Sequence, residues 1–268
     1  MVTTGELIAD YSVVDALGAG GHGQFFTARP PQRLGLDADL VVVKVVAGGD
    51  DRQFARFTRE LQMFAAVVHP SLVQLYDAGQ HEEWFFYSME WCAGGSYDRI
   101  APLDRSDALR AVAQIARAAH SLHGAGIVHR DIRPSNMLRR ADGTAALADL
   151  GLAQLGSGSV TSMAPTESIG FLDPAVLLGD PTGPQTDIYS LAASLHWLLT
   201  GQHLFAGLDP SDPLKAVRTV LRQPARVARD VLRPAEADLI DASTSKELGS
   251  RPATAEQFAD LVEELLGE

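Results

Sequence analysis

The segment VHRDIRPSN, residues 128–136, places an acid, an amide and two arginines directly after an apolar helical stretch. Asp131 can orient an attacking hydroxyl group and accept its proton, and Asn136 can ligate a metal ion through its amide oxygen. Thirteen positions after Asn136, Asp149 begins a turn of sequence Asp-Leu-Gly. A carboxylate on such a turn suits Mg²⁺, which prefers oxygen ligands. These residues predict chemistry on a phosphate group.

A second set of residues that could bind phosphate lies nearer the N-terminus. Gly18, Gly20 and Gly23 separate two predicted strands, and glycine lets the backbone approach a phosphate closely. A glycine-rich hairpin turn explains them equally well, but the second strand argues against a dinucleotide-binding fingerprint, which leads into a helix. Lys44 interrupts the apolar strand VVVKVV, so it either reaches solvent or has a partner. Glu60 on the next predicted helix is a candidate partner, although a solvated helix face would also explain it.

The elements that must position these residues change in character along the chain. Strands rich in β-branched and aromatic residues are predicted at 11–17, 24–28, 40–46, 73–77 and 84–91. Apolar residues at helical spacing predict helices at 52–67, 104–123, 186–200, 213–221, 235–244 and 255–266. Ser106 is a candidate cap, Thr254 with Gln257 a capping box, and residues 152–170 a mobile loop. A small β-rich lobe therefore precedes a larger helical lobe, with a hinge near 90–95.

The composition bounds the class of protein. Of 268 residues, 46% are hydrophobic and 21% charged, which is typical of a soluble globular protein. No run of about eighteen apolar residues predicts a membrane span, and the N-terminus does not resemble a signal peptide. The net charge of −12 argues against a general nucleic-acid binder. Cys92 is the only cysteine, which excludes an intrachain disulfide and favours a reducing compartment.

Taken in chain order, these motifs resemble the eukaryotic-type (Hanks-type) protein kinase domain, and the chain is similar to bacterial serine/threonine protein kinases from about residue 11 to 266. The resemblance implies an α+β, bilobal fold in one kinase domain, 1–268. Its N-lobe, about 1–91, would be a small antiparallel sheet with one helix, and its C-lobe, about 92–268, mainly helical. It also implies a serine/threonine kinase that transfers the γ-phosphate of ATP to protein hydroxyls, with Mg²⁺ or Mn²⁺.

The resemblance assigns roles residue by residue. The catalytic positions are Asp131, Arg133, Lys44 and Glu60, and the metal ligands are Asn136 and Asp149. The ATP-binding positions are Leu17, Gly18, Gly20, Gly23, Phe25, Lys44, Met89 (the gatekeeper), Glu90 and Cys92. Asp187 matches a buried aspartate that supports the catalytic loop, and Arg251 matches a late arginine that normally anchors a glutamate.

Three positions depart from the family pattern. Arg133 replaces a lysine, and Phe25 replaces a valine and would either stack on the adenine or fill its pocket. Ala175 stands where the family has the glutamate that partners Arg251, so Asp173 or Asp180 would have to substitute. These departures leave a second hypothesis, a pseudokinase scaffold with little or no catalysis. A small-molecule kinase is a weaker third hypothesis, because residues 168–171 resemble a peptide-docking loop.

The resemblance also implies regulation and partners. Arg130 would receive a phosphate from the loop after Asp149, chiefly on Thr161 or Thr166, with Ser159 and Ser162 as further sites. Ser168 would bond the catalytic aspartate. The expected partners are ATP, a protein substrate with serine or threonine and, for autophosphorylation, a second copy. No nucleic acid or direct membrane contact is expected. The location would be cytoplasmic, either as a whole protein or as the cytosolic domain of a longer membrane-anchored one.

Overall fold

The computed structural model describes residues 5–20, 23–47, 50–100, 103–149, 166–209 and 211–267. Two compact units make up the chain. Unit 1 consists of residues 1–68 and 73–92, and unit 2 consists of residues 69–72 and 93–268. The short segment 69–72 joins unit 2 because Leu147 N donates to Ser71 O at 2.9 Å and Leu72 bridges to Leu147.

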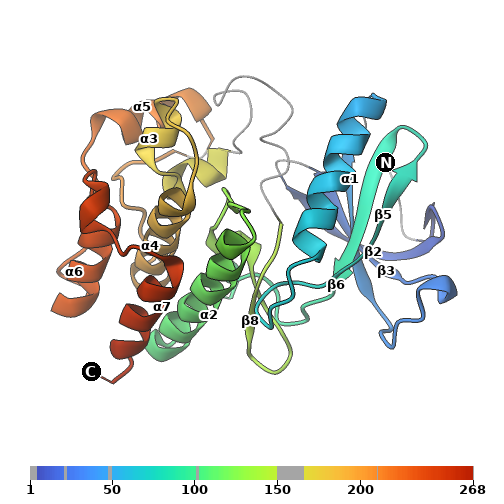
Figure 1. The fold of residues 1–268 in the computed structure, drawn as a ribbon, viewed down its shortest axis with the longest axis horizontal. Coiled ribbons are helices and arrows are strands. Elements are labelled where there is room, and N and C mark those ends of the chain that lie inside the picture. Colours follow the sequence, from blue (N-terminus) through green and yellow to red (C-terminus); the bar gives the residue numbers. More distant parts are fainter. Residues whose placement is uncertain are drawn as a thin grey trace. The chain divides into compact units, whose positions relative to one another are not determined.

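Unit 1 is built on a six-stranded antiparallel sheet in the order β1-β2-β3-β4-β6-β5 (Figure 1). Its strands are β1 (Leu7–Ile8), β2 (Tyr11–Gly20), β3 (Gly23–Arg29), β4 (Val41–Ala47), β5 (Leu75–His81) and β6 (Trp84–Glu90). The 3₁₀ helix η1 (Gln32–Leu34) and the helix α1 (Asp51–Ala65) complete it. Every predicted strand is present, with ends moved by a few residues. Strand β1 was not predicted, because an alternation of apolar and polar residues cannot be recognised in two residues.

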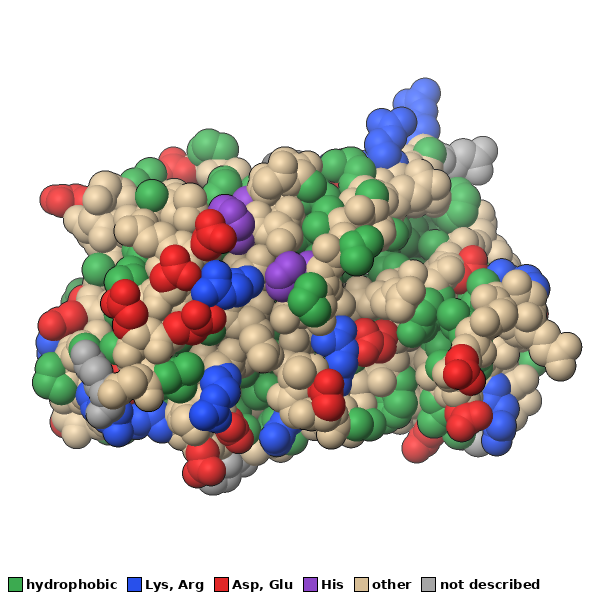
Figure 2. All heavy atoms as spheres, turned by 60° about the horizontal axis from the view of Figure 1, so that its bottom comes forward, with side chains coloured by type: hydrophobic (Ala, Val, Ile, Leu, Met, Phe, Trp, Pro, Cys, Tyr) green, Lys and Arg blue, Asp and Glu red, His purple; other side chains and the backbone are tan. Residues whose placement is uncertain are grey.

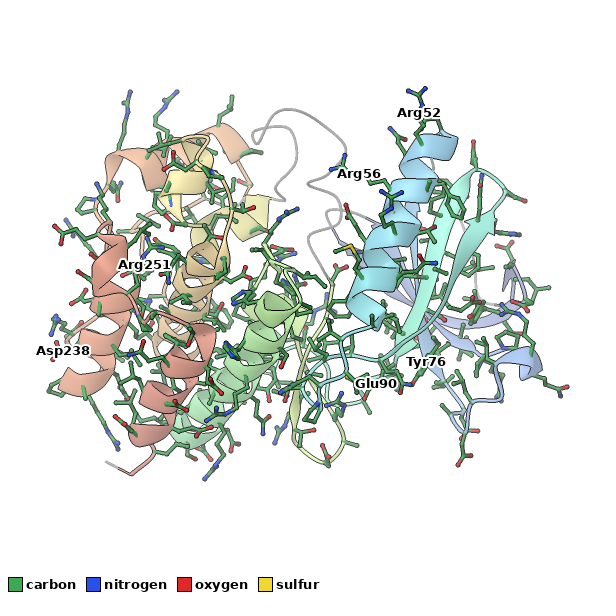
Figure 3. All side chains as sticks on the ribbon, in the orientation of Figure 1. Arg52, Arg56, Tyr76, Glu90, Asp238 and Arg251 are labelled. Carbon is green, nitrogen blue, oxygen red and sulfur yellow. The ribbon has the colours of Figure 1, made fainter. Side chains whose placement is uncertain are left out.

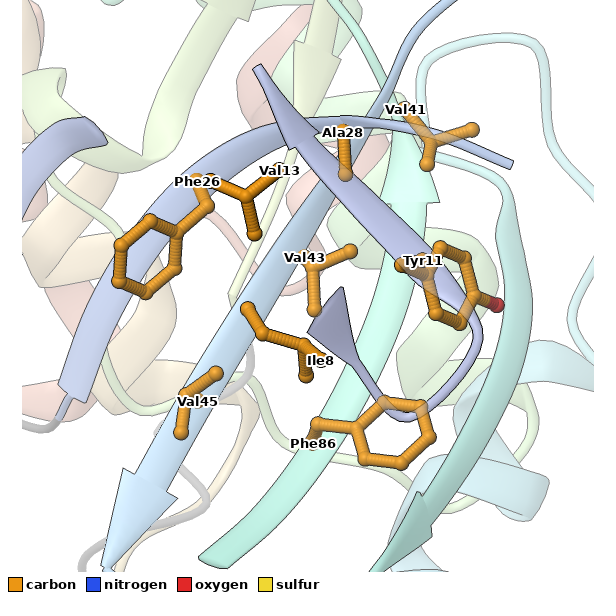
Figure 4. Close-up of a cluster of buried hydrophobic side chains, with 9 residues drawn as sticks. All are labelled: Ile8, Tyr11, Val13, Phe26, Ala28, Val41, Val43, Val45 and Phe86. Atoms are coloured by element: carbon orange, nitrogen blue, oxygen red, sulfur yellow. The ribbon is translucent and has the colours of Figure 1, made fainter. Parts of the chain in front are cut away.

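One face of this sheet carries the apolar core of unit 1 (Figure 4). Alternate residues point to the same face of a strand, so Val41, Val43 and Val45 of β4 all join this cluster. Tyr11 packs in it edge-on to Phe86, with ring centroids 5.8 Å apart. The remaining members are Ile8, Val13, Phe26 and Ala28. Lys44, between two of these valines, therefore points to the opposite face.

Helix α1 covers that opposite face. Its N-cap Asp50 accepts a hydrogen bond from Gln53 N at 2.8 Å, which explains why the helix begins there. Phe54 and Phe57 of α1 lie 5.0 and 5.6 Å from the ring of Phe85 on β6. The sheet is thus packed on both faces, which suits the apolar character of β4 on both sides.

Unit 2 is mainly helical. Its helices are α2 (Arg105–Gly124), α3 (Pro174–Leu177), α4 (Pro184–Thr200), α5 (Pro213–Arg222), α6 (Pro234–Ser243) and α7 (Ala255–Glu264). It also contains the 3₁₀ helices η2 (Pro134–Asn136), η5 (Thr166–Phe171) and η6 (Leu248–Ser250), and the antiparallel pair β7 (Met137–Arg139) and β8 (Ala145–Leu147). Figure 1 shows α2, α4 and α7 side by side, and α4 is buried along nearly its whole length. In the described part of the chain, no helix is both long and apolar enough to cross a membrane.

Several local predictions for unit 2 were wrong. The apolar residues 126–128, which a strand before His129 would also fit, form none, because Gly126 and Ile127 close the end of α2 by donating to His123 O and Leu122 O. Asp104, not Ser106, is the N-cap of α2. Residues 166–170 belong to η5, whose Ser168, Ile169 and Phe171 are buried. The rest of the predicted loop, 152–165, lies outside the described residues.

The capping box at the start of α7 was half right. Thr254 Oγ1 accepts from Gln257 N at 3.1 Å, as predicted. Gln257 Oε1, however, accepts from Ala253 N at 2.7 Å and not from Thr254 N.

The surface of the chain is mixed in charge, and on the face drawn in Figure 2 acidic side chains lie beside basic ones.

Candidate functional site

The glycine-rich segment forms the end of the β2–β3 hairpin. Gly18 pairs with Phe25 and Gly20 with Gly23, while residues 21–22 lie outside the described residues. Gly23 has φ = +148°, and a Cβ there would lie 2.3 Å from Val45 O, so only glycine fits. A second strand follows the glycines, as predicted, and Leu17 on β2 is half-buried.

Lys44 lies on β4 at the centre of the face that α1 covers, and its residue is only 5% exposed. The interpretation that it reaches solvent is therefore wrong. Its Nζ atom lies 4.9 Å from the ring centroid of Phe25 and 5.8 Å from that of Tyr87. Glu60 is half-buried on α1, and its Oε1 lies 3.5 Å from Nε of Arg56, one turn earlier. Figure 3 labels Arg56 on this helix.

The predicted hinge follows the end of β6. Met89 is buried and pairs with Val42 of β4 and Leu75 of β5. Glu90 N donates to Gln74 O at 2.9 Å, which fixes the strand end against the residue before β5. Cys92 is buried directly after it. The adenine-binding role that the resemblance implies for these residues stays a prediction.

In unit 2, the residues predicted for catalysis form one hydrogen-bonded loop. Asn136 Nδ2 donates to Asp131 O at 2.7 Å and to Asp131 Oδ2 at 2.9 Å. Arg133 Nε lies 3.4 Å from Asp131 Oδ1. Asp131, Arg133 and Asn136 are all buried. The carboxylate that would accept a proton is thus held by an amide on one side and a guanidinium on the other.

Asp187 of α4 is fully buried and accepts hydrogen bonds from the backbone of this loop. Its Oδ2 accepts from His129 N at 2.8 Å and its Oδ1 from Arg130 N at 2.9 Å. His123 Nε2, near the end of α2, lies 2.8 Å from Oδ2 as well. A buried carboxylate is costly unless its oxygens are satisfied, and three donors satisfy this one.

His129 is part of the same support. Its Nε2 donates to Ala148 O at 3.2 Å, while Asp131 N lies 3.4 Å from its Nδ1. Burial lowers the pKa of His129, although the carboxylates of Asp187, Asp131 and Asp149 act in the opposite direction. The ring is therefore a neutral connector between the catalytic loop and the residue before Asp149.

Asp149 and Asn136 supply oxygen atoms suited to a hard cation. Ala148 N donates to Asn136 O at 2.9 Å, which keeps the two segments together. Both side-chain hydrogen bonds of Asn136 use its nitrogen, so its amide oxygen is the atom that can ligate a cation. Asp149 and Arg130 have φ = +60° and +69°, a region that few non-glycine residues adopt. Such strain often accompanies functional sites.

The missing glutamate partner of Arg251 is replaced by Asp173. Arg251 Nη1 lies 2.6 Å from Asp173 Oδ2, with side chains only 2% and 4% exposed. Arg251 also donates to Ser245 O and Gln185 O at 2.8 and 2.9 Å. Figure 3 shows Arg251 among the helices of unit 2. Asp180, the other candidate, is exposed.

The predicted regulatory residues are only partly visible. Thr161, with Ser159 and Ser162, lies outside the described residues, and of Thr166 only the backbone is described, at the start of η5. Ser168 Oγ is buried without a hydrogen-bond partner in the described part of the chain, so its predicted bond to Asp131 is not formed. Arg130 lines a small pocket in unit 2 together with Leu172, Asp173, Val176, Thr182, Thr186 and Ser190.

Two residues that sequence reasoning missed contribute to these arrangements. The sequence pattern predicts His123 only as the end of a helix and Tyr87 only as part of a strand. The signal for Tyr87 was available, because an aromatic residue on a strand next to a buried lysine can pack on it, but only once the strands are paired. No signal in the sequence indicated that His123 meets Asp187.

Known proteins similar to this chain point in one direction. A family described as "Protein kinase domain" matches residues 11–268. The probable serine/threonine-protein kinase PknB of Lactococcus lactis is 29% identical over 94% of this chain and 44% of its own length. Serine/threonine-protein kinase PknB of Mycobacterium leprae is 30% identical over 98% of this chain and 44% of its own length. The chain thus spans less than half the length of these relatives.

Among solved structures, the crystal structure of a mutant form of the Mycobacterium tuberculosis PknI kinase domain is similar, with a TM-score of 0.75. It is 24% identical, and the match covers 98% of each chain. At this identity the likeness establishes the fold, an antiparallel sheet with one helix followed by a helical part.

Proposed function

The chain belongs to the protein kinase domain family, and from this premise we propose that it transfers the γ-phosphate of ATP to serine or threonine hydroxyls of a protein. Family membership implies ATP and a divalent cation in general. Mg²⁺ is the proposed ion, with Mn²⁺ as a substitute, because a carboxylate and an amide oxygen suit hard cations. The whole of 1–268 would act as one kinase domain.

The proposed mechanism assigns a task to each residue. The oxygen of the substrate hydroxyl bonds to the γ-phosphorus, while the bond between this phosphorus and ADP breaks. Asp131 accepts the proton that the hydroxyl loses. Arg133 stabilises the charge on the transferring group. Asn136 and Asp149 hold the cation, which neutralises phosphate charge when bound. Lys44 binds the α- and β-phosphates, with Glu60 as its acidic neighbour on α1.

Residues of the hairpin and the hinge in unit 1 would bind the rest of the nucleotide, each at either its phosphates or its base. The glycines of β2 and β3 approach the phosphates with their backbone, and the hinge offers backbone groups to the base. The proposed positions are Leu17, Gly18, Gly20, Gly23, Phe25, Met89, Glu90 and Cys92.

The observation that carries the proposal is the pair of hydrogen bonds from Asn136 to Asp131, supported by Asp187 beneath. A scaffold without activity would not need a carboxylate oriented by an amide, a guanidinium and a buried aspartate. The relatives named above are also all called serine/threonine-protein kinases. Catalysis is therefore preferred to the scaffold hypothesis.

Incubation with labelled ATP, Mg²⁺ and a generic serine- and threonine-containing protein substrate tests this function. The wild-type chain should incorporate label, and Asp131→Asn, which removes the proton acceptor at almost unchanged volume, should not. Nucleotide binding is measured separately by thermal shift, where ATP at 100 times Kd should stabilise the fold by about 2.7 kcal/mol. Absence of both label and thermal shift would refute the proposal, whereas binding without label would support the scaffold.

The proposed regulation rests on Arg130. A phosphate adds about −1.5 to −2 charge, so one carried by the loop after Asp149 would be attracted to this arginine. Thr182, Thr186 and Ser190 also line the pocket beside Arg130. Peptide mass spectrometry after incubation with ATP should find phosphate on Thr161 or Thr166. An unphosphorylated loop in an active enzyme would contradict this regulation.

A further inference from the structure

We propose that Phe25 and Tyr87 form an aromatic clamp that holds the ammonium group of Lys44 in position for the phosphates of ATP. Both would be positioning residues, acting through Lys44 and not on the reacting atoms. The inference rests on the proposed function for the identity of the ligand. The clamp itself is a property of unit 1 alone.

The three residues lie in register on three adjacent strands. Phe25 of β3 is the direct cross-strand partner of Lys44 on β4, and Lys44 is the direct partner of Tyr87 on β6. Directly paired residues point to the same face of a sheet, so the lysine is flanked by an aromatic ring on each side. The Nζ distances of 4.9 and 5.8 Å to the two ring centroids lie within the range of cation–π attraction.

The contacts between Lys44 and the two rings matter because the lysine is buried. Lys44 is only 5% exposed, so its charge has lost most of its water. An ammonium removed from water needs compensation, and the negative face of an aromatic ring supplies some of it, whereas an aliphatic side chain would supply none. The aromatic rings on both sides of Lys44 therefore offset part of the cost of burying its charge, which aliphatic side chains would not do.

The clamp also connects Lys44 to helix α1. The ring of Tyr87 lies 6.0 Å from that of Phe57 on α1, and Phe57 stacks on Phe85 at 5.6 Å. Tyr87 is therefore braced from behind by the helix that carries Glu60. This arrangement fixes the lysine laterally through rings and gives Phe25 a task other than stacking on the adenine.

The first test needs no nucleotide. The chain contains only three lysines, Lys44, Lys215 and Lys246, so labelling with ε-¹³C-lysine gives three assignable NMR signals. The signal of Lys44, shifted by the ring currents, should move toward the random-coil position in Phe25→Leu and in Tyr87→Leu. The matched control is Phe26→Leu, the same change on the same strand with the side chain on the opposite face.

The second test separates the phosphates from the base. Phe25→Leu and Tyr87→Leu should each weaken ATP binding by about tenfold, while binding of adenosine, which has no phosphate, stays unchanged. Phe25→Tyr, which keeps a ring, should restore ATP affinity. A raised KM for ATP with a smaller change in kcat is expected in parallel.

The outcomes distinguish this inference from the proposed function. If the wild-type chain binds no ATP, the proposed function fails and the positioning role fails with it, while the Lys44 signal still decides whether the clamp exists. If Phe25→Leu weakens adenosine and ATP equally, Phe25 contacts the base and the inference is wrong. An unmoved Lys44 signal in both leucine variants also overturns it. Should a leucine variant not fold, Phe25→Tyr and Tyr87→Phe must leave the signal shifted.

Discussion

The two units hold their charged site residues by different means. In unit 1, the sheet register and two rings fix Lys44. In unit 2, hydrogen bonds to the buried Asp187 fix the loop that carries Asp131. Ring contacts weaken gradually when one is removed, whereas a buried carboxylate network that loses a member leaves polar groups unpaired. The polar unit is therefore expected to be the more fragile one.

The largest expected effect follows from the loss of Asp187. Asp187→Ala leaves two backbone N–H groups and His123 without their acceptor, so the free energy of unfolding should fall by about 3–5 kcal/mol and phosphoryl transfer should be lost. Urea unfolding and the label assay measure the two effects. The control is Asp238→Ala, on the surface of α6, where the expected change is within about 1 kcal/mol. Equal losses in both variants would contradict the comparison.

The second largest effect should come from Asp173. Asp173→Ala strands the guanidinium of Arg251 in the interior and should cost about 3 kcal/mol in urea unfolding. Asp180→Ala, seven positions on, removes an exposed carboxylate and should change the stability by less than about 0.5 kcal/mol. The reverse order would mean that Asp180 is the true partner of Arg251.

Removing the hydroxyl group of one tyrosine in each unit tests the same comparison, with a smaller expected change in stability. Tyr11 Oη in unit 1 lies 2.8 Å from Ser88 Oγ and 2.9 Å from Asp77 Oδ2, so Tyr11→Phe should cost about 1 kcal/mol. Tyr189 Oη in unit 2 is buried with no hydrogen-bond partner in the described part of the chain. Tyr189→Phe should therefore be neutral or stabilising. Thermal unfolding of both variants checks this, and a larger loss for Tyr189→Phe would show that its hydroxyl has a partner.

The smallest effect is a dependence on pH. Burial lowers the pKa of His69, His129, His196 and His203, all in unit 2, below the usual value of 6.5. As the pH falls, the histidines of the unfolded chain bind protons before those of the folded chain do. Their contribution to the free energy of unfolding is therefore fully present above pH 6.5 and is lost as the pH falls below this value. From pH 7 to pH 6 the loss is at most about 0.7 kcal/mol per histidine.

Urea titrations at pH 7 and pH 6 measure this loss. His196 shows its structural cause: Nδ1 donates to Gln202 O at 2.9 Å and Nε2 accepts from Ala228 N at 3.1 Å. Protonation of Nε2 would break the second bond. Fluorescence of Trp197 in a chain carrying Trp84→Phe and Trp91→Phe follows unit 2 separately. Greater stability at pH 6 than at pH 7 would contradict the assignment of neutral histidines.

Much of this arrangement could be predicted from local pattern. Strands β4 and β6 follow from β-branched and aromatic runs, and α4, α6 and α7 from helical spacing, because burial repeats along each element. The motif residues of unit 2 were predicted as a set, and the fold brings Asn136 into a hydrogen bond and Arg133 into an ion pair with Asp131.

What could not be predicted depends on which elements meet. Asp173 and Asp180 were equivalent candidates in the sequence, and only the fold buries one beside Arg251 and leaves the other in solvent. The role of Phe25 was open for a similar reason, since its position opposite Lys44 depends on strand pairing. Short elements such as β1, β7 and η5 contain too few residues for a pattern to be seen.

The pairing of Asp173 with Arg251 also determines what a glutamate at position 175 would do to the stability. Asp173 accepts from Ala175 N at 3.0 Å and neutralises Arg251 as well, so Ala175 now sits beside a site whose charge is already balanced. Changing Ala175→Glu alone would bring a second carboxylate next to Asp173 and should lower the stability, whereas Ala175→Glu together with Asp173→Ala should recover it. Measured by urea unfolding, this sign reversal would show that the residue typical of the family is harmful in this chain.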